Sequence, residues 1–140
     1  MEMHINWLAM AAAFNVQIII GYTWFHPSVM GNMWAKANNT TVEAMTPKNP
    51  GMVYGLSFLY TALYTFFLYI NVAGFGQEDV KFHTFQHGLA HAGLMTVLVL
   101  IPVLGTPALY EGRKKEYMIV QIGYWFLRTA LAMGIISLWR

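Results

Sequence analysis

The sequence predicts an all-α integral membrane protein in which four transmembrane helices form one bundle. Its composition is the first reason: 57% of the 140 residues are hydrophobic and only 10% are charged. A soluble domain carries roughly 25% charged residues, so most of this surface suits lipid better than water. The second reason is the length of the apolar stretches, which matches the thickness of a bilayer.

Four apolar stretches are long enough to cross a membrane. A helix needs about 20 apolar residues to span a hydrocarbon core of about 30 Å. We expect helices at about 5–26, 51–73, 80–105 and 117–139, with Pro102 kinking the end of the third. The stretches are too long for strands, so residues 1–140 are expected to form a single transmembrane domain.

The basic residues predict how the chain is oriented. Four spans place both termini on one side, with Lys81 and Arg140. The first and third loops hold the other five basic residues outside the spans, which are Lys36, Lys48, Arg113, Lys114 and Lys115. By the positive-inside rule, these loops face the cytoplasm of a bacterial inner membrane and both termini face its outer side.

Several classes of protein are excluded or disfavoured by composition. The chain has no cysteine, which rules out disulfides, iron–sulfur clusters and thiolate zinc sites. The net charge of +2 gives no basic footprint for nucleic acid. The first apolar stretch lacks a basic segment before it, so we expect it to remain as a helix rather than to act as a cleaved signal.

A ladder of histidines marks the third span. His83, His87 and His91 follow one another at intervals of four residues, which places them on one helix face. Three imidazoles in a row can bind a metal ion, pass protons or titrate near neutral pH. No carboxylate within the spans completes a metal site, and one helix cannot supply both axial ligands of a haem. The favoured interpretation is therefore polar packing without a cofactor, and a metal or haem site is the alternative.

An arginine lies near the middle of the fourth span. Arg128 shares a helix face with Gln121 and Tyr124, and a charge at this depth costs about 3 kcal/mol on insertion scales. His91 reaches a similar depth, so Arg128, His87 and His91 could line one pocket for an anion, a carbonyl group or a lipid headgroup. The alternative is that Arg128 snorkels or bonds to carbonyl groups at a helix end.

Other polar side chains lie within the first two spans. The first span holds Asn15, Gln17, Tyr22 and His26, which a hydrogen-bonded helix interface would explain. Tyrosine hydroxyls of the second span could reach the same pocket. The candidate ligand-binding residues are His87, His91, Arg128, Gln121, Tyr124 and His26.

Pairs of small residues predict close helix contacts. Such pairs let two backbones approach each other in lipid. They could serve contacts within one bundle or between subunits. The pairs are Gly51 with Gly55, Gly88 with Ala92, and Ala130 with Gly134.

Residues 21–34 carry a motif of glycine, aromatic residues and proline. It reads Gly-Tyr-Thr-Trp-Phe-His-Pro, then Met-Gly-Asn-Met-Trp, and the chain later has Leu-Tyr-Glu-Gly-Arg at 109–113 and Gly-Tyr-Trp at 123–125. This pattern resembles the bacterial membrane family known as domain of unknown function 1761, over nearly the whole chain. The resemblance implies a four-helix membrane protein and no particular activity. Physically, Pro27 should end the helix, Trp24 and Trp34 should anchor the bend, and Gly31 should permit a close or left-handed turn.

Three functions remain open from the sequence. The first is a non-enzymatic bundle that acts as a homo-oligomer or as an accessory subunit of a membrane complex. The second is a binding or conducting protein that uses a His/Arg cluster for a metal, haem, quinone, anion or protons. The third is a lipid-directed enzyme with a histidine as general base, which the absence of a visible nucleophile or acidic partner disfavours.

Overall fold

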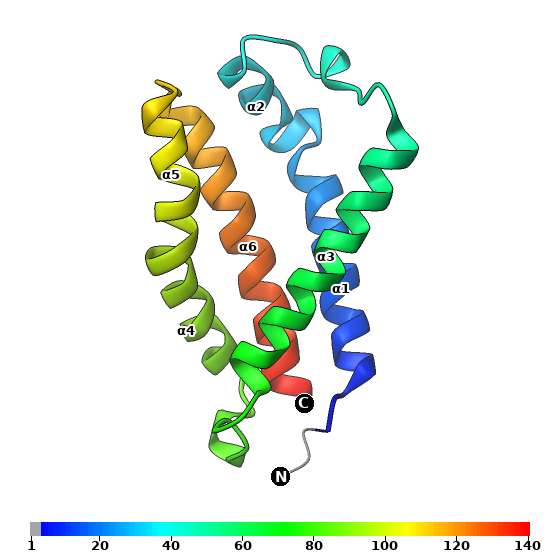
Figure 1. Ribbon diagram of the computed structural model, residues 1–140, viewed down its shortest axis with the longest axis vertical. Helices are drawn as coiled ribbons and strands as arrows, with labels where there is room; N and C mark the ends of the chain where they lie inside the picture. Colours follow the sequence, from blue (N-terminus) through cyan, green and yellow to red (C-terminus); the bar gives the residue numbers. More distant parts are fainter. Residues whose placement is uncertain (1–3) are drawn as a thin grey trace.

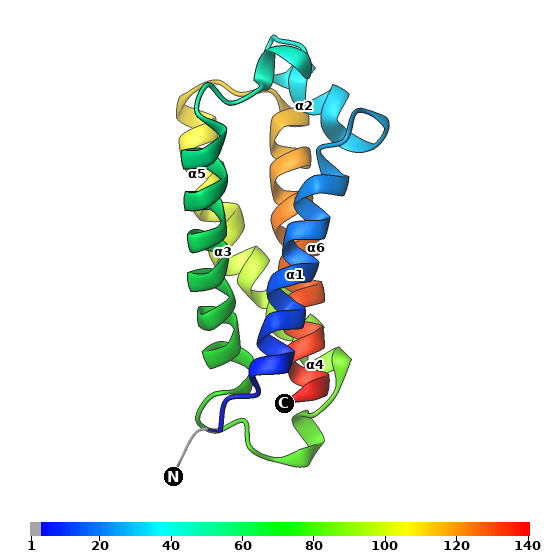
Figure 2. The same ribbon diagram turned by 90° about the vertical axis from the view of Figure 1, so that its right-hand side faces the viewer.

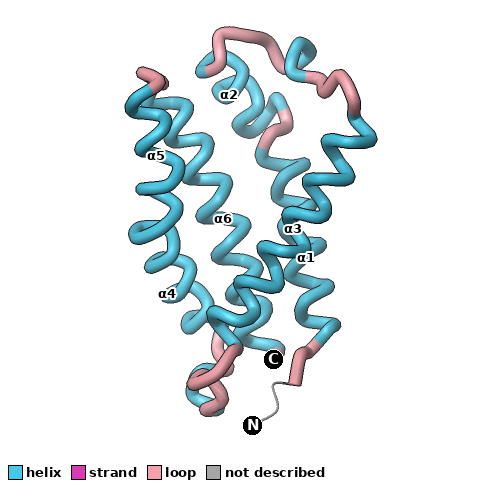
Figure 3. The backbone as a smooth tube through the Cα atoms, viewed as in Figure 1, coloured by secondary structure: helices cyan, strands magenta, loops and turns pink. Residues whose placement is uncertain are grey.

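A computed structural model describes residues 4–140 and confirms the predicted fold class. Four helical spans are long and apolar enough to cross a membrane. They are α1 (Trp7–Trp24), α3 (Pro50–Ala73), the continuous segment Phe85–Tyr110, and α6 (Lys115–Trp139). The described part of the chain contains helices and loops and no strand (Figure 3).

The helices begin at residues that suit a helix start. The Asn6 side chain accepts hydrogen bonds from the backbone of Leu8 and Ala9, both at 3.1 Å. Asn49 caps α3 through the backbone N–H of Met52 at 3.2 Å, and Pro50 fits the first turn because that position needs no donor.

The third span begins later and ends later than the sequence predicts. Residues Val80–Phe82 form a separate turn (η3), and α4 (Phe85–Met95) starts only at Phe85, where Thr84 caps it by accepting from the N–H of His87 at 3.2 Å. The span then continues through a π-helical turn, η4 (Thr96–Leu100), into α5 (Ile101–Tyr110).

Pro102 therefore does not end the third span. It lies in the first turn of α5, where the preceding π-turn accommodates the missing N–H.

The loop between the first two long helices is partly helical. It contains a π-turn, η1 (Pro27–Gly31), the short helix α2 (Asn32–Ala37) and a further turn, η2 (Glu43–Met45). Figure 1 places this segment at one end of the molecule, beside the link between α5 and α6. We call this the loop end, and the opposite end, which holds residues 4–6, 74–84 and 140, the termini end.

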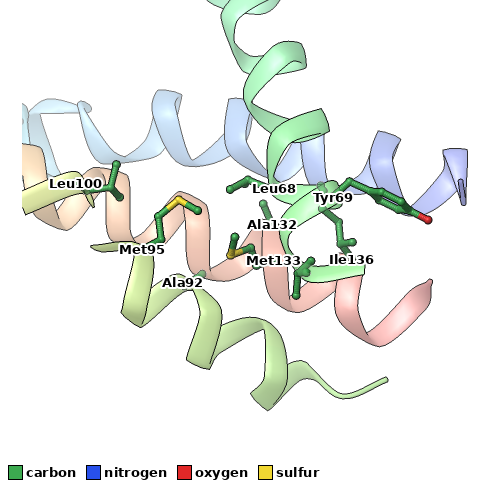
Figure 4. Packing of buried hydrophobic residues seen from close by; sticks show 11 residues of the cluster. Leu68, Tyr69, Ala92, Met95, Leu100, Ala132, Met133 and Ile136 are labelled. Atoms are coloured by element: carbon green, nitrogen blue, oxygen red, sulfur yellow. The ribbon is translucent and has the colours of Figure 1, made fainter. Parts of the chain in front are cut away.

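Helix α6 packs against α1, α3 and α4. A side chain on Gly88 would overlap the Met133 backbone, and one on Gly134 would overlap the Phe85 ring. The core around this crossing lies toward the termini end (Figure 4). It comprises Ala13, Leu68, Tyr69, Val72, Ala92, Met95, Leu100, Ala130, Ala132, Met133 and Ile136.

The bundle opens toward the loop end. All residues of α3 from 50 to 60 are exposed, and its buried positions start at Thr61. Figure 1 shows α3 leaning away from α5 and α6 in this half, and Figure 2 shows α3 apart from α6 from the side. A Cβ on Gly55 would meet nothing within 4 Å, so this glycine makes no close helix contact in the monomer.

Candidate functional site: the Arg128 cavity

Arg128 lies buried in the middle of α6 and joins three helices. Its side chain is only 5% exposed. Nε and Nη2 donate to the Gln17 side-chain oxygen on α1, at 3.1 and 2.8 Å. Nη2 also donates to the Thr61 hydroxyl on α3 at 3.2 Å, and Nη1 donates to the Tyr124 hydroxyl at 2.8 Å. Arg128 therefore bonds side chains of neighbouring helices rather than helix-end carbonyls.

Gln17 is held in place by partners of its own. Its amide nitrogen donates to the Thr65 hydroxyl at 2.7 Å and to the Ala13 carbonyl at 3.1 Å. These bonds fix which end of the Gln17 amide is the nitrogen, and the side-chain oxygen therefore faces Arg128. Thr65 in turn donates to the Thr61 carbonyl at 2.7 Å, so the polar network is connected from α1 to α3.

The positive charge of Arg128 is not neutralised by a carboxylate. Within residues 4–140, no Asp or Glu forms an ion pair with it. Aromatic faces supply part of the compensation, with the guanidinium carbon 4.7 Å from the Trp125 ring centroid, 5.2 Å from Tyr124 and 5.5 Å from Tyr64. These four hydrogen bonds use four of the five N–H donors of the guanidinium, which leaves one Nη1 N–H available.

A large cavity opens beside this charge. Its volume is about 920 Å³, and it extends from Arg128 toward the loop end between α1, α3 and α6. Arg128, Gln17 and Thr61 form its polar base. The remaining lining is mostly aromatic and apolar and consists of Ile18, Gly21, Tyr22, Phe25, His26, Pro27, Tyr54, Ser57, Phe58, Tyr60, Tyr124 and Trp125.

The outer part of the cavity faces the surroundings of the bundle. Tyr22 is 82% exposed, Tyr60 62% and Tyr54 56%. Because these residues lie on helices α1 and α3 that could span the membrane, the cavity is accessible from the side, between the two helices. It combines a buried cation with an apolar, laterally open wall.

Small residues allow α1 and its C-terminal turn to approach α6. A Cβ on Gly21 would lie 3.3 Å from the Tyr124 hydroxyl oxygen, and one on Gly123 would lie 2.9 Å from the Trp24 ring. The Trp24 indole N–H donates to the Val120 carbonyl at 3.1 Å. These contacts hold the loop end of α1 against α6 and define one side of the cavity.

The glycine and aromatic motif after α1 folds into a tight re-entrant turn. Helix α1 ends at Trp24, before Pro27, and Pro27 starts the π-turn. Gly31 has φ of −60°, so it is not left-handed, but a side chain there would overlap the backbone of Phe25 and His26. The Trp34 ring stacks on Tyr117 of α6 at 5.1 Å, which fixes the turn to the bundle.

The predicted ligand-binding residues divide into separate groups. Arg128, Tyr124 and His26 line the cavity together, whereas Gln121 is half-buried on α6 outside its lining. His26 lies at the mouth, where its Nδ1 accepts from the Ser28 N–H at 3.3 Å and lies 2.7 Å from the Ser28 hydroxyl.

The histidines of the third span lie elsewhere, toward the termini end. His87 and His91 have ring centroids 4.5 Å apart, and His91 Nδ1 is 3.0 Å from the Asn71 side-chain oxygen. Neither histidine lines the Arg128 cavity. His83 lies in the turn before α4, so it does not continue the helical ladder. In the described part of the chain, no three His, Asp or Glu side chains are placed to hold a metal ion.

Sequence reasoning did not identify the partners that fix Arg128. The sequence marks Gln17 only as a polar residue of the first span, and it gives no signal for Thr61. The signal that could have found Gln17 is its position among apolar neighbours, because a buried amide needs a polar partner. Tyr64 lies near the network, with its hydroxyl 2.7 Å from that of Thr129.

The fold and this cavity define a class of protein: a four-span α-helical membrane protein with a laterally open, mostly apolar cavity that has a polar base. The model of the family described as "Protein of unknown function (DUF1761)" matches residues 8–137. The chain therefore belongs to this family, as the motif at residues 21–34 indicated. Comparisons with curated proteins and with solved structures gave no match.

Proposed function

We propose that this protein binds an amphipathic molecule with an oxyanion headgroup, a carboxylate or a phosphate, in the Arg128 cavity. The observation that carries the proposal is a buried arginine that pairs with no carboxylate of residues 4–140 and lies at the base of a large, mostly apolar cavity. An anion there would receive the remaining Nη1 N–H and would neutralise a charge that is otherwise expensive at this depth.

The hydroxyl of Tyr124 supplies a second donor. It accepts a hydrogen bond from Arg128, which leaves its own proton to donate to a ligand. Together these two groups can bind two oxygens of one headgroup. The aromatic residues between α1 and α3 then provide an apolar surface for a hydrocarbon or ring system, and the volume of about 920 Å³ is at the upper end of ordinary ligand sites.

A purely structural role for Arg128 explains part of these observations. Bonds to Gln17, Thr61 and Tyr124 brace three helices, as a structural arginine would. That role requires neither an open cavity beside the guanidinium nor a charge that pairs with no carboxylate of residues 4–140. Ligand binding accounts for both features.

The test uses the protein in a mild, uncharged detergent and a brominated fatty acid, dibromostearate. Bromine quenches tryptophan fluorescence at short range, and Trp125 lines the cavity. We expect saturable quenching by the acid and much weaker quenching by its methyl ester, which lacks the charge. Equal quenching by the two compounds would contradict the proposal.

A second candidate role is self-association or assembly into a larger membrane complex. It is supported by the exposed half of α3, where Gly51 and Gly55 lie among large apolar side chains and where a Cβ on Gly55 would meet nothing within 4 Å. Light scattering on the purified protein measures this directly. A Gly55→Phe variant should shift the mass toward the monomer if this face joins two copies.

We also propose that the protein resides in a bacterial inner membrane with its loop end in the cytoplasm. The support is the distribution of basic residues, five at the loop end against Lys81 and Arg140 at the termini end. The first and third loops, which carry these five charges, are in contact, since Lys114 Nζ of the third loop lies 2.9 Å from the Asn39 side-chain oxygen of the first.

A further inference from the structure

The Arg140 guanidinium at the termini end has one edge without partners. Nη1 donates to the Val72 carbonyl at 2.8 Å, which fixes the side chain against the end of α3. Nε and Nη2 are buried and have no hydrogen-bond partner among residues 4–140. Burial also lowers the pKa of this guanidinium. Buried donors of a charged group are costly to leave unpaired, so an acceptor is expected at this edge.

The geometry of the free edge indicates which acceptor fits. Nε–H and Nη2–H lie side by side on a planar guanidinium and point in nearly the same direction. This arrangement matches two oxygens of a carboxylate or a phosphate, which arginine binds with paired hydrogen bonds. A single carbonyl oxygen would satisfy only part of it.

His87 offers a third unpaired polar atom near Arg140. Its Nε2 is buried and also has no hydrogen-bond partner in the described part of the chain. Arg140 interacts electrostatically with both His87 and His91. Val72, whose carbonyl binds Arg140, directly follows Asn71, whose side chain bonds to His91. Three unpaired buried nitrogens on two side chains thus gather beside the end of α3.

We propose that Arg140 and His87 form a binding site for one oxyanion, a carboxylate or a phosphate group, at the termini end. Arg140 would hold two of its oxygens through Nε and Nη2. His87 would donate from Nε2–H, and His91 packs against it at 4.5 Å while Asn71 bonds to His91. No residue is shared with the Arg128 cavity, so this site is independent of the function proposed above.

Among residues 4–140, Glu78 has a side-chain carboxylate that could compete for this edge. Glu78, in the turn after α3, lies close enough to influence Arg140 but forms no ion pair with it in the described structure. Glu78 is exposed. A Glu78→Gln variant therefore separates an external anion from the chain's own carboxylate.

The test has two arms, because a phosphate group can come from solution or from a lipid. In the first arm, inorganic phosphate is titrated into the full chain in an uncharged detergent and followed by calorimetry. In the second, native mass spectrometry compares the retention of phosphatidylglycerol with that of phosphatidylcholine. Binding in the first arm identifies a free anion as sufficient. If phosphatidylglycerol is retained preferentially and inorganic phosphate does not bind, the ligand is a lipid headgroup.

We expect Arg140→Gln to weaken the binding by about tenfold or more, as loss of a paired, charged contact requires. Arg113→Gln is the matched control, since Arg113 is an exposed arginine at the loop end that pairs with Glu111 at 2.7 Å. His87→Phe should also weaken binding, which provides a second variant if Arg140→Gln does not fold. Glu78→Gln should leave the affinity equal or higher.

The proposal is overturned if neither phosphate nor phosphatidylglycerol binds the parent protein. It is equally overturned if Arg140→Gln binds as the parent does. Binding that appears only in Glu78→Gln would show that Glu78 itself occupies this edge, which also contradicts an external ligand.

Discussion

Arg128 of α6 donates two hydrogen bonds to the single side-chain oxygen of Gln17 on α1, at 3.1 Å from Nε and 2.8 Å from Nη2. This pair joins residues 111 positions apart and sets the separation of the two helices beside the cavity. Because Gln17 also bonds Thr65 on α3 at 2.7 Å, the amide is the centre of a three-helix polar network. Loss of Gln17 should therefore loosen all three helices.

Replacing Gln17 with leucine should destabilise the protein by about 3 kcal/mol, because a charged donor pair loses its acceptor inside the bundle. Asn15→Leu is the matched control. Asn15 lies on the same helix and is exposed, and its side chain donates to the Ala11 carbonyl of its own helix at 2.8 Å. Unfolding in a mixture of mild detergent and dodecyl sulfate measures the free energy of unfolding of both variants. Equal stability of the two variants would show that the Gln17 bonds contribute little.

Gly88→Ala should disrupt the crossing of α4 and α6. A Cβ at this position would overlap the Met133 carbonyl, and backbone cannot move aside as a flexible side chain can. We expect a loss of roughly 1–3 kcal/mol or failure to fold, typical of overpacking.

Gly93→Ala is the control for that prediction, since a Cβ on Gly93 would meet nothing within 4 Å. It should leave stability unchanged or raise it by up to about 1 kcal/mol through helix propensity. Thermal unfolding of both variants distinguishes them, and equal tolerance of alanine at 88 and 93 would contradict the described crossing.

Trp24→Phe should lower stability by about 1 kcal/mol, since the indole N–H bond to the Val120 carbonyl is lost while the ring packing is largely kept. Trp7→Phe serves as the comparison, because Trp7 is 69% exposed at the start of α1. Thermal unfolding should separate the two. If both substitutions have the same effect, interfacial placement of the indole rather than the bond to α6 explains Trp24.

The orientation can be tested with reporter fusions. A fluorescent protein that folds only in the cytoplasm should be dark when fused after Arg140 and bright when inserted near residue 45, within the loop end. Alkaline phosphatase, which is active only outside the cytoplasm, should give the opposite pattern. The reverse result would place the five basic residues outside and contradict the orientation drawn from them.

The number of spans follows from the sequence because apolar length alone determines which segments can cross a bilayer. The bounds of the third span do not follow from apolar length, because they depend on local hydrogen bonds. Thr84 caps α4 at Phe85, and a π-turn before Ile101 lets the helix continue past Pro102. A threonine cap within a long apolar stretch has no strong sequence signal, and neither does a local change from α-helical to π-helical pitch.

The candidate site was predicted only in part for a similar reason. A central arginine is conspicuous in an apolar helix, so Arg128 and its neighbour Tyr124 could be identified. The partners Gln17 and Thr61 come from other helices, and their meeting depends on how those helices rotate and tilt. Equal depth suggested that His91 would join Arg128, but depth does not specify the angular position around the bundle.

The most direct test of the central claim is dibromostearate binding by three matched proteins, followed by quenching of tryptophan fluorescence. Ser57→Phe places a large side chain in the cavity from α3 and replaces no member of the Arg128 network, and Leu63→Phe places the same side chain on an exposed site outside the cavity lining. Parent and Leu63→Phe should bind the acid alike, and Ser57→Phe should lose saturable binding. If Ser57→Phe binds the acid as well as Leu63→Phe does, the cavity beside Arg128 is not a ligand site.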